Sequence, residues 1–77
     1  MMSAEKIKQT AVMYANTMIK SEQMFVDLFD RDKKYYSQVE CSAIIELANV
    51  YYNCKTGKIS RKEAGELQKE ILRGVEK

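Results

Sequence analysis

The residue types that most often carry chemistry in proteins are sparse in this chain. Its 77 residues include no histidine and only two cysteines, Cys41 and Cys54. Catalytic triads that use imidazole and zinc sites that use histidine are therefore excluded, and two thiolates supply only half of an all-cysteine zinc site. Without a histidine to activate them, both cysteines are expected to be small, buried apolar side chains.

Residues 52–63 resemble a calcium-binding EF-hand loop at three positions, Gly57, Ile59 and Glu63. Calcium needs about six to eight oxygen ligands, with acidic side chains early in the loop. The early ligand positions carry no carboxylate here; they are Tyr52, Cys54 and Thr56. A glycine that ends one helix and a cap that begins the next explain the same residues. The sequence therefore predicts no metal site.

Other catalytic arrangements are also missing. No glycine-rich phosphate-binding loop occurs. Glu40 and Glu46 lie six residues apart in a predicted helix, so their side chains point to different faces. We therefore expect a protein that is not an enzyme and that uses no cofactor and no small-molecule substrate.

Cations and tyrosines gather between residues 31 and 36, which suggests binding rather than catalysis. Basic side chains contact phosphates and aromatic rings stack on bases in nucleic-acid-binding proteins. Tyrosine is also enriched at protein interfaces, because it combines apolar area with one polar group. The candidate partner-binding residues are Arg31, Lys33, Lys34, Tyr35, Tyr36 and Tyr52.

A second basic group lies on the other side of the predicted central helix. It comprises Lys55, Lys58, Arg61 and Lys62. A helix of this length separates the two groups by about 25 Å, so we do not expect them to form one surface. The net charge of +2 gives no strong overall attraction to nucleic acid or acidic lipid.

The elements that must position these residues are predicted to be helices. The chain has no proline and only three glycines. Beyond a plausible N-cap at Ser3, apolar residues recur in steps of three and four from Ala4 to Phe29. This spacing predicts one long first helix, or two helices if the polar residues around Ser21 break it.

Two further helices follow in the pattern. Ser37 and Glu40 have the spacing of a capping box, and the helix that they begin runs to about Cys54. It carries few charges and is expected to be the most buried element. Gly57 suits the end of this helix, and a narrow apolar stripe predicts a last, amphipathic helix from Ser60. The prediction is an all-α, three-helix bundle, or a four-helix bundle, in a single domain over residues 1–77.

The first predicted helix has two neighbouring apolar stripes. Such a face is wider than one partner helix covers, so we expect the spare stripe to be buried in a two-fold homodimer. The candidate dimer residues are Val12, Ala15, Ile19, Val26 and Phe29.

We expect a cytoplasmic protein. Residues 1–6 lead directly into an amphipathic segment without the apolar core of a signal peptide. No window of eighteen apolar residues occurs, so we expect no membrane span. Two free thiols are typical of a reducing compartment.

Function follows by elimination. A small, nearly neutral helical protein without a chemical site is expected to bind a larger partner protein, as an adaptor, a regulator or an inhibitor of the kind that phages and mobile elements encode. The alternative is a dimeric nucleic-acid-binding regulator that uses residues 31–36.

Overall fold

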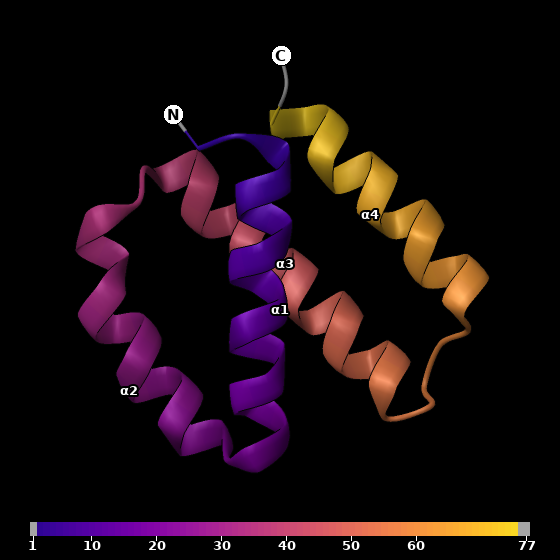
Figure 1. Cartoon of the computed structure of the whole chain (residues 1–77), viewed down its shortest axis with the longest axis horizontal. Coiled ribbons are helices and arrows are strands. Elements are labelled where there is room, and N and C mark those ends of the chain that lie inside the picture. The colour runs from indigo at the N-terminus through magenta and orange to yellow at the C-terminus, as the bar shows by residue number, and fades with distance from the viewer. Residues whose placement is uncertain (1, 76–77) are drawn as a thin grey trace.

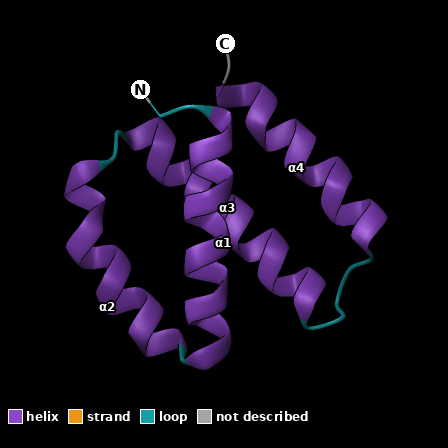
Figure 2. Cartoon of the chain, viewed as in Figure 1, coloured by secondary structure: helices purple, strands orange, loops and turns teal. Residues whose placement is uncertain are grey.

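Four α-helices and one short 3₁₀ turn make up the computed structural model, which describes residues 2–75 (Figures 1 and 2). The elements are α1 (Ala4–Lys20), α2 (Glu22–Asp32), η1 (Lys33–Tyr35), α3 (Gln38–Lys55) and α4 (Arg61–Val75). The expected all-α class is confirmed, in its four-helix form.

A single extended residue, Ser21, separates α1 from α2. Its backbone has φ −170° and ψ 125°, and its N–H donates to the Thr17 carbonyl at the end of α1. Its Oγ accepts a hydrogen bond from the N–H of Met24, in the first turn of α2. One serine therefore ends one helix and caps the next, which resolves the alternative that the sequence left open.

The other predicted helix ends are confirmed. Ser3 Oγ accepts from the N–H of Lys6 and so caps α1. Ser37 and Glu40 form both hydrogen bonds of a capping box at the start of α3. Gly57 follows α3 with φ +84°, in the left-handed region that favours glycine.

The helices form a small, bundle-like globule that is thin in one direction. Figure 1 shows α1 lying across α3, with α2 and α4 on opposite sides of this crossing. The main neighbour of α2 is α1, and the main neighbour of α4 is α3. The principal extents of the backbone are 32 × 32 × 14 Å, so most of the molecule is only one or two helices thick.

The core lies where α1 crosses α3. It is a cluster of buried side chains from α1, α3 and the end of α4: Ile7, Ala11, Tyr14, Ala43, Ile44, Leu47, Ala48 and Val75. The helix with the most buried residues is α3, as predicted. No residue of α2 is fully buried. The buried core therefore lies between α1 and α3, and α2 is an outer helix that is less buried.

One carboxylate belongs to this interior. Glu40 is 5% exposed, and its Oε1 accepts from the N–H of Ser37 at 2.8 Å. Its Oε2 accepts from the N–H of Met2 at 2.6 Å, which ties the N-terminal segment to the start of α3. These backbone hydrogen bonds favour the charged form and lower the pKa of Glu40 below its usual range.

Candidate interaction surface

The thin shape of the molecule leaves large apolar side chains partly exposed to solvent. Seven of them are between 41% and 73% exposed: Val12, Met13, Ile19, Met24, Val26, Tyr35 and Val39. The accessible surface is 5221 Å², against about 4,800 Å² for a typical monomer of this mass. Single exposed apolar side chains are common on globular proteins, whereas a contiguous apolar surface marks a site of interaction.

The residues predicted to form a dimer stripe do not share one free surface. Val12, Ile19 and Val26 are 41%, 47% and 53% exposed. Ala15 is only 1% exposed, and Phe29 is half-buried against the core. The break at Ser21 separates the α1 members from the α2 members, so Val12 and Val26 line different hollows.

The cations near the end of α2 already have partners. Arg31 Nε lies 3.1 Å from Asp32 Oδ1, and Lys33 Nζ lies 2.8 Å from Asp30 Oδ1. Lys34 Nζ lies 5.3 Å from the centre of the Tyr35 ring. A phosphate at this corner would have to compete with two carboxylates, because each aspartate lies beside the cation that would bind it.

The two adjacent tyrosines of this corner have different roles. Tyr35 is 73% exposed. Tyr36 donates to the hydroxyl of Tyr14 at 3.0 Å, and Tyr14 donates to Asp32 Oδ2 at 2.9 Å. Burial, followed by these two hydrogen bonds, raises the pKa of Tyr14 above its usual range. Tyr36 is therefore part of the packing, whereas Tyr35 is free to meet a partner.

An aromatic cluster attaches α2 to α1. Tyr14 meets Phe25 and Phe29 edge to face, with ring centres 5.8 and 5.4 Å apart. Phe29 also stacks on Tyr36 at 6.4 Å. Such edge-to-face pairs add about 0.5–1.5 kcal/mol each beyond the burial of their area. Phe29 is thus needed within the chain.

An extended concave surface lies between α1, the C-terminal half of α3, and α4. It consists of two adjoining hollows of about 410 and 260 Å³ that share Val12 and Tyr51. The larger hollow is also lined by Glu5, Lys8, Gln9 and Gln68. The smaller one adds Ala15, Asn16, Cys54, Lys55 and Arg61. We call this surface the α1–α3–α4 trough.

Hydrogen bonds between helices hold the walls of the trough. The Tyr51 hydroxyl of α3 donates to Gln68 Oε1 of α4 at 2.6 Å. Lys55 Nζ donates to Asn16 Oδ1 of α1 at 2.8 Å. Burial, and then the nearby carboxylate of Glu5, raises the pKa of Tyr51. The phenol therefore stays neutral in the floor of the trough at ordinary pH.

One end of the trough is basic. Lys55 and Arg61 line it, and Lys58 and Lys62 lie close by in sequence. Within residues 2–75, none of these four cations lies within ion-pair distance of a carboxylate. Lys58 Nζ lies 5.7 Å from the centre of the ring of Tyr52. Tyr52 is the one predicted partner-binding residue that lies outside residues 31–36. Two members of the second basic group of the sequence, Lys55 and Arg61, therefore line a hollow.

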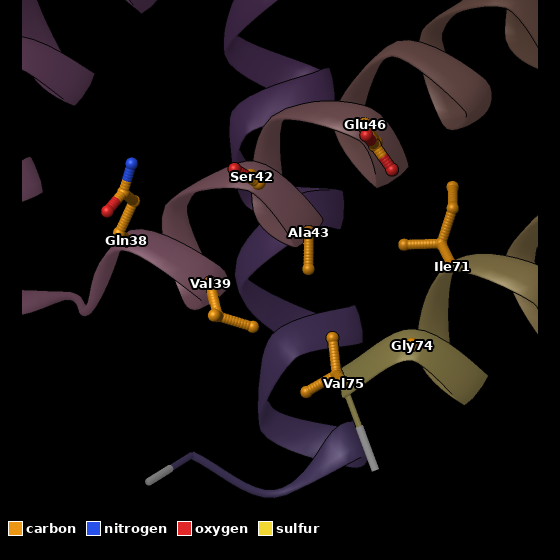
Figure 3. A pocket seen from close by; sticks show the side chains of 8 residues that line it. All are labelled: Gln38, Val39, Ser42, Ala43, Glu46, Ile71, Gly74 and Val75. Atoms are coloured by element: carbon orange, nitrogen blue, oxygen red, sulfur yellow. The ribbon is translucent and has the colours of Figure 1, made fainter. Parts of the chain in front are cut away.

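A smaller groove lies between the N-terminal half of α3 and the end of α4. Figure 3 shows Val39, Ala43, Ile71 and Val75 pointing into it, while Gln38 points away. The groove has a volume of about 270 Å³, and its charged wall residue is Glu46. This groove could hold an apolar side chain, but it lacks the cations that distinguish the trough.

The sequence indicates Val12 and the second basic group as separate features, and it does not predict that they line one surface. The trough joins residues far apart in the chain, such as Val12, Tyr51 and Arg61. The spacing of Tyr51, Cys54 and Lys55 shows only that they share one face of a helix. The crossing of α1 over α3 brings the other wall to them, and no local pattern encodes this crossing.

Two other properties of residues 2–75 concern metal binding and membrane insertion. No group of three or more histidine, cysteine, aspartate or glutamate side chains is placed to hold a metal ion in this part of the chain. Among the same residues, no helix has both the length and the hydropathy to cross a membrane. Comparison with models of known families, with curated proteins and with solved structures gave no match.

Proposed function

We propose that this protein is a small, non-enzymatic module that binds a partner protein through the α1–α3–α4 trough. The observation that carries the proposal is a trough with an apolar floor between three helices that leave it open, with Val12 41% exposed at the centre. Adaptor, regulator and inhibitor are the roles that such a module can fill, including inhibitors that phages or mobile elements encode. Two free thiols support a cytoplasmic site of action.

The dimensions are adequate for this role. A stable interface takes about 800 Å² from each partner, which is about 15% of the 5221 Å² of exposed surface. The backbone is 32 Å wide in two directions, so one broad side can supply this area. Tyrosine and arginine are enriched among interface hot spots, and the trough offers one of each, Tyr51 and Arg61.

The homodimer and the nucleic-acid-binding regulator have less support. Ala15 is buried, and the exposed members of the predicted dimer stripe line different hollows. Arg31 and Lys33 lie beside aspartates. Both possibilities are outcomes of the experiment below.

The test compares the full-length protein with two variants as bait in extracts of the cells that express it. Val12→Asp places a charge in the trough. Met13→Asp is the matched control, because Met13 is 44% exposed on the same helix but does not line the trough. Circular dichroism and the thermal midpoint establish that both variants are folded.

We expect the wild type and Met13→Asp to retain one or a few proteins that Val12→Asp does not retain. We also expect the measured mass of the bait protein to be that of one chain. Equal retention by Val12→Asp would contradict the proposal. A captured species that nuclease removes would favour the nucleic-acid role instead. A bait mass of two chains that Val12→Asp halves would favour the homodimer.

A further inference from the structure

We infer that the trough accepts an amphipathic helix of the partner protein, with apolar anchors in the two hollows and carboxylates against Lys55 and Arg61. This inference rests on the proposed function and adds the chemistry of the partner. It depends on three features of the trough: the nature of its walls, its length and its charge.

The walls favour a helix over an extended peptide. An extended peptide that adds to a sheet needs a free strand edge, and residues 2–75 contain no strand. The walls are α-helices, whose backbone groups are already hydrogen-bonded, so they offer few donors or acceptors to another backbone. A bound helix satisfies its own backbone and needs only side-chain contacts. Proline-rich peptides prefer aromatic-lined grooves, whereas Tyr51 is the one aromatic lining residue that the two hollows share.

The length of the trough suits about three helical turns. From Glu5 to Asn16, the α1 wall spans about 17 Å at about 1.5 Å per residue. Anchors at positions i, i+4 and i+7 of a bound helix lie on one face and span about 10 Å. Two adjoining hollows can therefore take neighbouring anchors from a single helix. Val12 and Tyr51, which line both hollows, would contact consecutive anchors.

The charge is distributed unequally along the trough. At one end, Lys8 Nζ lies 3.6 Å from Glu5 Oε2, so this end is nearly neutral. At the other end, Lys55 and Arg61 have no carboxylate partner within the described part of the chain. The helix α4 begins at Arg61 with the positive end of its dipole, and α3 ends at Lys55 with the negative end of its own, so the two side-chain cations set the potential there.

This asymmetry gives the bound helix a direction. Its carboxylates belong at the end nearest Arg61, whose planar guanidinium can bind a carboxylate through two nitrogens. With an acidic C-terminal turn, the carboxylates and the negative end of the helix dipole both face these cations, and this attraction opposes the weakening of the helix by acidic residues at its own C-terminus. Such contacts raise specificity and the association rate more than they raise affinity.

The test uses three labelled model peptides of about fourteen residues and the full-length protein. The first carries leucine at i, i+4 and i+7 and glutamates in its last two turns. The second replaces the glutamates by lysines, and the third has the composition of the first with the leucines spread around the helix. Fluorescence anisotropy measures binding at about 50 mM and about 200 mM salt, because contacts between exposed charges weaken as salt rises.

We expect the acidic peptide to bind at least about tenfold more tightly than the lysine peptide at the lower salt, which corresponds to about 1.4 kcal/mol. Arg61→Glu should remove this preference. Lys69→Glu is the matched control, because Lys69 is exposed on α4 but does not line the trough, and it should keep the preference. Val12→Asp should abolish binding of both helical peptides.

Other results would overturn the inference in distinguishable ways. Equal binding of the acidic and lysine peptides, lost with Val12→Asp, would refute the acidic partner but not the proposed function. No binding of the acidic peptide up to about 1 mM, a free energy of about −4.1 kcal/mol, would refute the helical occupant. Retention of a cellular partner by the wild type in the bait experiment would then leave the proposed function standing. Binding of the third peptide, whose leucines are spread around the helix, as strongly as the first would also refute the amphipathic helical occupant.

Discussion

Replacing Tyr14 by phenylalanine removes one oxygen atom from the contact between α1, α2 and Tyr36, the residue that follows η1. Tyr14 is fully buried, and its hydroxyl donates to Asp32 Oδ2 and accepts from Tyr36. The ring and its contacts with Phe25 and Phe29 remain in the variant. Tyr14→Phe therefore isolates the contribution of a hydrogen-bonded chain from that of aromatic packing.

The expected cost follows from these partners. A hydrogen bond to a charged group contributes about 1.5–3 kcal/mol, and one between neutral groups about 0.5–1.5 kcal/mol. The Asp32 side chain is 16% exposed and keeps its contact with Arg31, so water and the guanidinium compensate for part of the loss. We expect a net destabilisation of about 2 kcal/mol, out of a total stability of about 4–12 kcal/mol for a chain of this size.

Thermal and urea denaturation, followed by circular dichroism, measure this cost. For a domain of this size, about 2 kcal/mol corresponds to a fall of about 8–16 °C in Tm. Tyr35→Phe is the control, because Tyr35 is 73% exposed and the change should stay within about 0.5 kcal/mol. Equal Tm values for the two variants would refute the reasoning.

The raised pKa of Tyr14 also predicts that wild-type stability falls as the pH rises above about 10, since unfolding then releases its proton.

Two further changes test the helix ends. The lowered pKa of Glu40 means that the unfolded chain binds the proton more readily, so stability should fall as the pH drops from about 5 to 3. Glu40→Gln should flatten this fall in Tm, and an unchanged slope would contradict it. Gly57→Ala should destabilise the fold by about 1–2 kcal/mol, because a side chain at φ +84° is strained although nothing lies within 4 Å of its added carbon. Gly65→Ala, in the middle of α4, is the matched substitution and should not destabilise.

The sequence predicted those parts of the fold that depend on near neighbours. Ser3, Ser37 with Glu40, and Gly57 lie at the helix ends that their residue types predict, because capping needs only groups within about four residues. The break at Ser21 stayed open, because apolar spacing continues through it. The structure resolves it through two hydrogen bonds of that serine.

The candidate surface was harder to predict, because contacts between distant residues decide it. Tyr35 and Tyr36 are indistinguishable in sequence, but a hydroxyl 22 residues away binds one of them. Ala15 lies in the apolar pattern beside Val12, yet one is buried and the other is exposed. These differences arise from the way α1 crosses α3, which apolar periodicity does not specify.

The lack of any fully buried residue in α2 has a consequence for how the chain opens. An element held by a few aromatic contacts can detach locally, while the interior formed by α1 and α3 stays intact. The trough is built by α1, α3 and α4 alone, so it persists through such partial unfolding. The trough and the least buried helix of this protein are thereby built from different elements of the fold.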